Sequence, residues 1–507
     1  MTPSKNLYDL IHTLSKSEKR HFKLIAQGQD GIKKNKYLSI FEALEEMKSF
    51  DEEVLKTKLK EKKLVQHLSA NKAYLFQLIL KSLKQPFLSH EVHFILNDHI
   101  ESAIILQERG FTKLSLRQLQ KAKELAQKAE ALPDLIKIID LQRTYEYNSF
   151  FNTKAPIDEY HEQQVQTVDL LKELVEIRAS SANMYSFTNN ALRNTEKIFL
   201  ETYSRTINDY LPIISGLNAF TSKVTYYNDV INYFAAINQI KQAQGVIQEG
   251  LALWDKNPEK KTVQLIEYYK MVGVILRVYA HWRQYGRILK ILNRLDEMSR
   301  LKESRFILSK ILEIRKGYTL IALQGTCDFK EAKQYVPEVI AWLASNPSRL
   351  PFHSRKTLWF LIATTYFMNN EYKECMKWLI KLINEGPGIK IDIVTVAKLL
   401  SIVIHWELKN MDSVKYLSKD TRKYLGEKNI VNPLAEKILT FFEKEIGRSG
   451  KIDVQKWYTV KKECISIIKK HGISNVSEYF DFVSWISSKI NKKSFAEELR
   501  AKIKPEK

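Results

Sequence analysis

Histidines near residue 90 are the first side chains of this 507-residue chain whose spacing could support chemistry. His90 and His93 flank Glu91, and His99 follows nearby. A zinc metalloprotease helix needs two residues between the glutamate and the second histidine, which places the histidines four apart on one face. Here one residue intervenes, although residues three apart also share a helix face. A weak metal site and ordinary surface histidines are both open, and we expect surface histidines.

Two further patterns could indicate phosphate binding or nucleophilic catalysis. A phosphate-binding loop requires a glycine five residues before Gly450 and a serine or threonine after Lys451, but Glu445 and Ile452 stand there. Cys375 occupies a position where we expect a small buried side chain, so a structural role is favoured over a nucleophile. The sequence predicts no catalytic residues, no metal and no cofactor, and therefore a protein that is not an enzyme.

The cysteine content and the hydropathy pattern bear on where the protein resides. Cys327, Cys375 and Cys464 are far apart and fit no metal or redox spacing, as expected in a reducing compartment. The sequence shows no run of eighteen apolar residues and no apolar signal core near residue 1. We expect a soluble, cytoplasmic protein.

The positive charge of the chain is concentrated in three blocks. The net charge is +22. Residues 1–88 carry 17 basic and 10 acidic side chains (+7), residues 270–316 carry 12 and 4 (+8), and residues 448–507 carry 14 and 7 (+7). The rest of the chain is neutral. Local basic surfaces of this kind indicate an acidic partner or nucleic-acid phosphates.

The spacing of apolar residues predicts helices throughout the chain. Only 16 glycines and 12 prolines occur, about half the usual share, which excludes turn-rich sandwiches, barrels and propellers. Ser15 and Glu18 form a predicted capping box at the start of a helix. Further helices are predicted over 37–47, 52–60, 64–84 and 479–490, with Pro86 ending the first block.

A short motif at helix–helix turns repeats along the middle of the chain. It comprises a polar residue, a large apolar residue, two mostly polar residues and a small or aliphatic residue. The apolar member is Ile240, Tyr285, Phe329, Tyr372 and Met411, at steps of 45, 44, 43 and 39, with an earlier copy at Phe111. We expect the apolar residue to fill the turn and the residue three later to lie where two helices nearly touch. Each unit is then a helical hairpin that needs its neighbours to bury its apolar face.

One of these units resembles the tetratricopeptide repeat. Trp359, Ile362, Ala363 and Tyr366 precede its turn, Tyr372, Cys375, Leu379 and Leu382 follow it, and Pro387 ends the second helix. Weaker copies include Tyr227 to Ile247 and Val272 to Leu292. The resemblance implies an all-α fold, a right-handed tetratricopeptide-like α-solenoid of helical hairpins. We expect a basic N-terminal helical block (1–88), the repeat array (89–447, clearest over 219–425) and a basic helical C-terminal cap (448–507), with a linker at 447–451 and no clear turn over 157–210.

In such arrays the first helix of each hairpin lines a concave groove that holds ligands. By register, the groove residues are Asn228, Asn232, Lys270, Arg277 and His281. Asparagine can bond both groups of a peptide backbone, and arginine and lysine can hold carboxylate or phosphate. This set resembles in part the carboxylate clamp of peptide-binding members, but the full set of five clamp residues is not found.

A basic stripe is predicted on the following second helix, where Arg283, Arg287, Lys290 and Arg294 recur at spacings of 4, 3 and 4. The stripe is either a solvated face or a contact for an acidic partner or nucleic acid.

Our first functional hypothesis is a non-catalytic helical-repeat scaffold or adaptor that binds a protein or peptide, acidic in character, in its groove. The alternative is a nucleic-acid-associated regulator that uses the basic N-terminal block, with the solenoid as sensor or recruiter. No membrane partner is expected.

Overall fold

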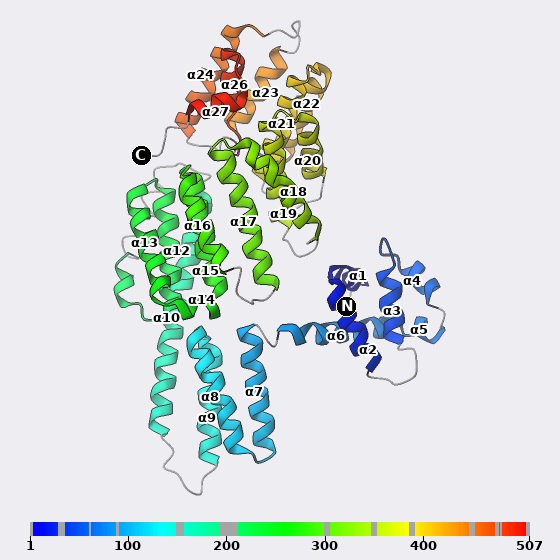
Figure 1. The fold of residues 1–507 in the computed structure, drawn as a ribbon, viewed down its shortest axis with the longest axis vertical. Coiled ribbons are helices and arrows are strands. Elements are labelled where there is room, and N and C mark those ends of the chain that lie inside the picture. Colours follow the sequence, from blue (N-terminus) through cyan, green and yellow to red (C-terminus); the bar gives the residue numbers. More distant parts are fainter. Residues whose placement is uncertain are drawn as a thin grey trace. The chain divides into compact units, whose positions relative to one another are not determined.

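The computed structural model describes residues 4–28, 36–59, 62–87, 91–148, 157–191, 211–298, 305–345, 352–384, 391–445, 452–471, 476 and 479–502. These residues form helices and no strands, so the all-α prediction is confirmed for them (Figure 1). Three sequence features lie outside the described residues: His90, Pro387 and the predicted linker at 447–451.

The described part of the chain divides into two compact units between residues 167 and 168. This division differs from the predicted three parts. In the first unit, the predicted boundary at residue 88 separates two hydrophobic clusters, one drawn from residues 7–79 and one from residues 96–160. In the second unit, residues on both sides of the predicted boundary at 447 belong to one hydrophobic cluster, whose members lie between Leu320 and Phe495.

The described residues of the N-terminal block form six helices. They are α1 (Ser4–Thr13), α2 (Lys16–Gly28), α3 (Lys36–Glu45), α4 (Glu52–Lys58), α5 (Lys62–Gln66) and α6 (Leu68–Phe87). The predicted capping box is confirmed, because the Ser15 N–H donates to Glu18 Oε2 at 2.7 Å and the Glu18 N–H donates to Ser15 Oγ at 3.3 Å. The predicted helix over 64–84 is divided at His67, and α6 continues through Pro86 to Phe87. The prediction that Pro86 ends this helix is therefore off by one residue.

The rest of the first unit contains a hairpin, α7 (Val92–Glu108) with α8 (Thr112–Ala129), and then α9 (Leu132–Asn148). Helix α7 contacts α8, and α8 contacts α9. Helix α10 (Ile157–Ala191) starts in this unit and ends in the second. Over 157–191, where the sequence showed no clear turn, the structure has one 35-residue helix, and residues 192–210 lie outside the described part.

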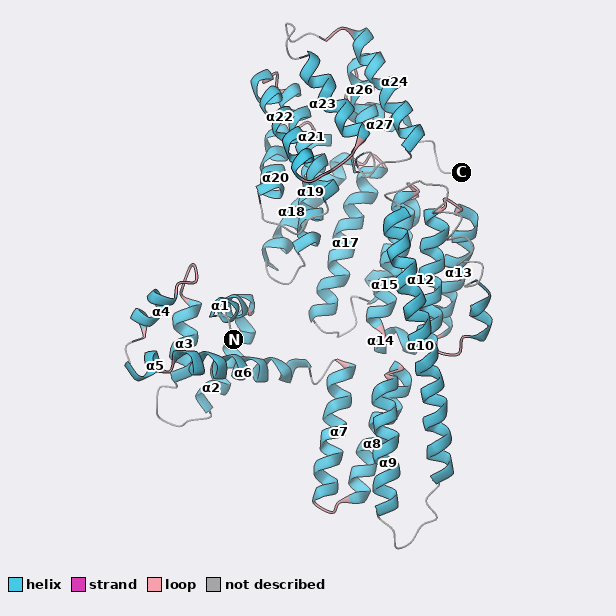
Figure 2. Cartoon of the chain, turned by 180° about the vertical axis from the view of Figure 1, so that it is seen from behind, coloured by secondary structure: helices cyan, strands magenta, loops and turns pink. Residues whose placement is uncertain are grey.

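The described residues of the second unit include five hairpins, which Figures 1 and 2 show as pairs of coiled ribbons. They are α12 (Phe220–Ala236) with α13 (Ile240–Lys256), α15 (Leu265–His281) with α16 (Tyr285–Met298), α17 (Arg305–Gly325) with α18 (Phe329–Ser345), α19 (Phe352–Met368) with α20 (Tyr372–Asn384), and α21 (Ile391–Glu407) with α22 (Met411–Glu427). The short helices η1 (Leu211–Gly216) and α14 (Pro258–Val263) lie before the first and second pairs. Each first helix contacts the first helix of the next pair.

The same three-residue turn joins six described hairpins. Its middle residue has a positive φ, between 57° and 79°, and this residue is Gly110, Asn238, Arg283, Cys327, Asn370 or Lys409. The third turn residue donates its N–H to a carbonyl five residues earlier, as Glu371 does to Tyr366 at 2.9 Å. This is the Schellman arrangement, which satisfies the last carbonyl groups of the first helix.

The repeat motif predicted the packing of the second helices. In the five pairs of the second unit, the large apolar member begins the second helix, and the residue three later is fully buried. These buried residues are Ala243, Ile288, Ala332, Cys375 and Val414. The ring of Tyr285 also packs on Gly325 of the next hairpin, where a Cβ would lie 2.2 Å from the ring.

The predicted register of the earliest copy is wrong by one residue. Gly110 takes the middle turn position, so Thr112 corresponds to the apolar member and Ser115 to the buried one. Phe111 and Leu114, which were assigned those roles, are 54% and 45% exposed. Ser115 is buried and its hydroxyl donates to the Ala103 carbonyl at 2.7 Å.

The C-terminal helices are α23 (Pro433–Glu445), α24 (Val454–His471), α26 (Phe482–Asn491) and α27 (Phe495–Lys502). Helix α26 begins at Phe482, three residues later than predicted. Its N-cap is Asp481, whose carboxylate accepts a hydrogen bond from the Ser484 N–H at 2.9 Å. In the part of the chain that the structure describes, no helix is both long and apolar enough to cross a membrane.

The turn geometry predicts opposite effects for the same substitution at two glycines. Gly110→Ala is expected to lower the free energy of unfolding by about 1 kcal/mol, because an alanine at positive φ is strained. Gly426→Ala, inside α22 with nothing within 4 Å of the new Cβ, is expected to raise it by roughly 0.5–1 kcal/mol. Urea denaturation measures both, and hydrogen exchange of α7–α8 and α21–α22 assigns each effect. Equal signs would contradict the proposed role of the turn.

Candidate partner-binding surface

Two of the predicted groove residues meet across successive hairpins. Asn232 lies on α12 and Arg277 on α15, and both are the thirteenth residue of a 17-residue helix. The Arg277 guanidinium donates to the Asn232 carboxamide oxygen in a short hydrogen bond. Arg277 is exposed, and this hydrogen bond uses one of its five N–H groups. We use the name first-helix face for Asn228, Asn232, Lys270, Arg277 and His281.

The other residues of the first-helix face are less open than predicted. Asn228 is half-buried, and its carboxamide oxygen is buried without a hydrogen-bond donor among the described residues. Lys270 is exposed but pairs with Glu267 at 2.8 Å, one helical turn earlier. His281, the last residue of α15, is half-buried. Arg277 is thus the exposed cation of this set that has no carboxylate partner among the described residues.

The predicted basic stripe does not exist as a single stripe. Arg283 is the middle residue of the turn, with a φ of 57°, and α16 begins only at Tyr285. The spacing that placed Arg283 in line with Arg287 assumed a continuous helix, and the turn interrupts it. Arg283 is exposed, but it belongs to the turn and not to the helix face that carries Arg287.

The two remaining arginines of the stripe already have partners within the protein. The Arg287 guanidinium lies over the Tyr279 ring, 5.8 Å from its centroid. Arg294 donates to both carboxylate oxygens of Asp255, at 3.3 and 3.2 Å. Burial raises the pKa of Asp255, but the hydrogen bonds and charges of Lys261 and Arg294 outweigh it and hold the pKa below its ordinary value. Arg294 therefore links α16 to α13.

On α19, the position equivalent to Asn228 is covered by the C-terminal segment, which comprises residue 476 and residues 479–502. Phe360 on α19 corresponds to Asn228 on α12, since both are the ninth residue of a 17-residue helix. Phe360 packs on Tyr479, and Phe367 of the same helix packs on Phe480 and Phe495. Both phenylalanines are buried, at 2% and 1% exposure.

Polar contacts also hold the C-terminal segment against the hairpins. Glu407, the last residue of α21, accepts from Trp485 Nε1 at 2.6 Å and pairs with Lys489. Arg500 stacks over Phe329 at 5.4 Å and donates to the Cys327 carbonyl at 3.4 Å. Sequence reasoning missed these contacts. The available signal was that the ninth residue of the first helix changes from Asn228 in α12 to Phe360 in α19 and Leu399 in α21.

The histidines and cysteines considered as possible metal ligands or nucleophiles contact other side chains or are buried. His93 Nδ1 lies 3.6 Å from Asp134 Oδ2, and His99 Nδ1 forms a hydrogen bond of 2.8 Å with Gln118 Oε1. Over the described ranges no group of three or more His, Cys, Asp and Glu could hold a metal ion. Burial raises the pKa of Cys327 to about 11 and of Cys464 to about 12, and also raises the pKa of Cys375, so these thiols are poor nucleophiles at neutral pH.

We expect Arg294 to contribute to stability and Arg277 to contribute little. Arg294→Ala should lower the free energy of unfolding by up to about 1 kcal/mol, since its pair with Asp255 is partly exposed and screened by solvent. A double-mutant cycle with Asp255→Ala in urea denaturation measures the coupling. The lowered pKa of Asp255 means that this contribution is present above the ordinary carboxyl pKa and is lost as the pH falls through the lowered value. A larger stability loss for Arg277→Ala would contradict this assignment.

The C-terminal segment should stabilise the later hairpins. Phe495→Ala is expected to cost roughly 3 kcal/mol, because the ring is buried against Phe367 and Phe480. Hydrogen exchange within α19 should become faster. Tyr416→Ala, at a side chain that is 70% exposed, is the control and should change stability by less than about 0.5 kcal/mol. Unchanged exchange in α19 after Phe495→Ala would show that the segment does not support this helix.

Comparisons of this chain with protein-family models, with curated proteins and with solved structures find no match. The tetratricopeptide resemblance therefore stays a prediction from the sequence. Functional inference for the chain rests on its own residues and their contacts.

Proposed function

We propose that the hairpins form a right-handed, tetratricopeptide-like solenoid with helical ends. Two observations support this arrangement. Each first helix contacts the next first helix, and the six turns share one backbone geometry, so successive hairpins repeat the same local structure. The C-terminal segment covers apolar residues of α19 and α21, as a terminal cap of a repeat array would.

We further propose that the protein is a non-catalytic scaffold or adaptor of the cytoplasm, which binds an acidic protein or peptide through the first-helix face. The hydrogen bond between Asn232 and Arg277 carries this proposal. It presents an amide and a guanidinium side by side on neighbouring hairpins, and the guanidinium keeps donors for a carboxylate.

The first-helix face is a better candidate than the equivalent face of the later hairpins. The ninth residue of α19 is Phe360 and the last residue of α21 is Glu407, and both contact the protein's own C-terminal segment. The ninth residue of α12 is Asn228 and the last residue of α15 is His281, and Arg277 is exposed. The proposed ligand site therefore comprises the early hairpins of the second unit.

The charge of the region favours an acidic ligand. Residues 270–316 carry 12 basic and 4 acidic side chains. Arg294 is neutralised by Asp255 and Lys270 by Glu267, whereas Arg277 is bound to an uncharged amide. A ligand carboxylate would give Arg277 the charged partner that the protein itself does not supply.

A peptide array tests the proposal. Acidic 15-residue peptides are paired with analogues in which each Asp and Glu is replaced by Asn or Gln, and binding of the full-length protein is measured. The wild-type protein should prefer the acidic members. The double variant Arg277→Glu with Asn232→Ala should weaken that binding by about 10- to 100-fold, the effect of losing charged hydrogen bonds.

The matched control is Lys290→Glu, a charge reversal at an exposed residue of α16, which should keep wild-type binding. Equal loss in both variants would mean that net charge alone attracts the peptides. Equal binding of acidic and neutral peptides would rule out an acidic ligand. Affinity purification from the native cell with mass spectrometry, repeated with both variants, then identifies partners that depend on Arg277.

A further inference from the structure

Helix α2 of the N-terminal block carries a cluster of four cations on one face. Lys16, Lys19, Arg20 and Lys23 fall within an arc of about 100° when each residue is turned by 100° around the helix. Together with Leu24 and Glu45 they line a depression of about 370 Å³. We call the four cations the α2 basic face; Leu24 of α2 and Glu45 of α3 border it.

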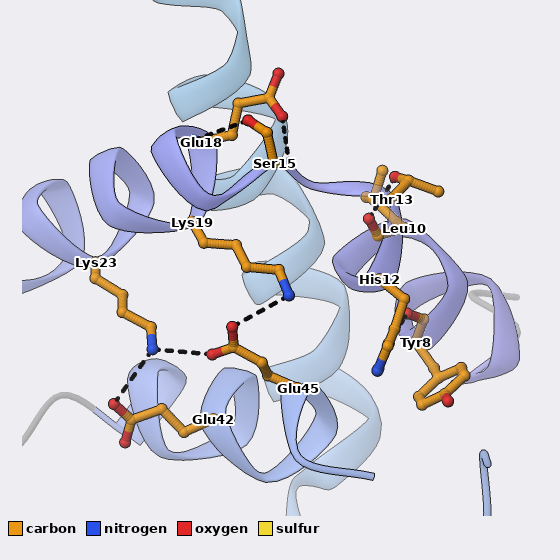
Figure 3. Close-up of polar contacts among 10 residues, drawn as sticks. All are labelled: Tyr8, Leu10, His12, Thr13, Ser15, Glu18, Lys19, Lys23, Glu42 and Glu45. Atoms are coloured by element: carbon orange, nitrogen blue, oxygen red, sulfur yellow. Dashed lines mark hydrogen bonds and ion pairs between the residues drawn. The ribbon is translucent and has the colours of Figure 1, made fainter. Parts of the chain in front are cut away.

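The α2 basic face is held rigidly by the fold of the block. The capping box of Ser15 and Glu18 fixes the start of the helix (Figure 3). On another face of α2, Phe22 is buried and stacks on Phe41 with 4.6 Å between ring centroids. The cations are therefore presented by an anchored helix, which lowers the entropic cost of binding a ligand.

Two of the four cations are already neutralised. Figure 3 shows Lys19 and Lys23 pointing to Glu45, at 3.1 and 2.9 Å, and Glu42 lies 3.9 Å from Lys23. Burial raises the pKa of Glu45, but the two lysines outweigh it and keep the pKa below its ordinary value. Glu45 is thus fully ionised at neutral pH and committed to these lysines.

The other two cations have no such partner. Lys16 and Arg20 are exposed, and neither forms an ion pair with any residue that the structure describes. They lie four residues apart, about 6 Å along the helix axis. The α2 basic face therefore has a surplus of positive charge directed to solvent, beside a shallow depression.

We propose that the α2 basic face binds the phosphate backbone of double-stranded nucleic acid, with Lys16 and Arg20 as the phosphate contacts. A large interface with a folded protein has an apolar core of several side chains, and Leu24 is the one apolar residue among those that line the depression. Single strands are held by aromatic stacking, and no aromatic residue lines the depression. Phosphates of a duplex need only positioned cations and a backbone-wide surface.

Salt-dependent binding of the full-length protein to a fluorescent 20-base-pair DNA of mixed sequence tests this proposal. Fluorescence anisotropy is recorded between 50 and 300 mM salt, and the logarithm of the affinity is plotted against the logarithm of the salt concentration. Lys16→Gln with Arg20→Gln should reduce the slope by about 1.8, since each phosphate contact contributes about 0.9. At about 0.1 M salt the loss in affinity should be on the order of 50-fold.

Three further variants make the result specific. Lys81→Gln with Lys84→Gln removes the same charge from exposed residues of α6 and should keep the wild-type slope. Lys16→Arg with Arg20→Lys keeps both cations and should keep binding, which separates charge from folding. Glu45→Gln releases Lys19 and Lys23 and should make the slope steeper.

Several outcomes would overturn the proposal. Equal slope changes in the α2 and α6 variants would mean that the net charge of the protein, and not the α2 basic face, determines DNA binding. Absence of salt-dependent DNA binding would exclude the site. Loss of binding to a 20-residue polyglutamate, or to vesicles containing an anionic lipid, without an effect on DNA would assign the α2 basic face to an acidic protein or to a membrane. None of these results depends on Arg277, so the groove proposal is tested separately.

Discussion

The repeated hairpins depend on one backbone constraint, a residue of positive φ in the middle of each three-residue turn. The Schellman hydrogen bonds end the first helix there and start the second helix two residues later. Because this distance is constant, the first residue of every second helix reaches the same place, and the residue three later is always buried. The contacts between neighbouring first helices follow from this register, including the one between Asn232 and Arg277.

The constraint is satisfied by different residues at different costs. Gly110, Asn238 and Asn370 are residue types that accept positive φ readily, whereas Arg283, Cys327 and Lys409 accept it only with strain. Sequence inspection did not find these positions, because the motif that repeats is the one after the turn. The same omission explains two errors, the shifted register at Phe111 and the placement of Arg283 on a helical stripe. In both cases a helical period was counted through residues that belong to the turn.

Local patterns otherwise predicted much of the fold. Helix content, the Ser15–Glu18 cap and the buried positions of the repeats all depend on residues close in sequence, where spacing is informative. The contacts of the C-terminal segment join residues that are far apart in the sequence, from 78 positions for Glu407 and Trp485 to 173 for Cys327 and Arg500, and no local period reports them. The partners of Arg294 and Lys19 were missed for the same reason, since Asp255 and Glu45 lie on other helices. Charge counts located the basic blocks, but only the structure separates neutralised cations from those directed to solvent.

The long separation between α19 and its cover has a consequence for synthesis. Translation proceeds from the N-terminus, so Phe367 leaves the ribosome 128 residues before Phe495. At 5–20 residues per second this delay is roughly 6 to 26 s. During that interval Phe360 and Phe367 lack the aromatic rings that later bury them, and chaperones have time to bind them.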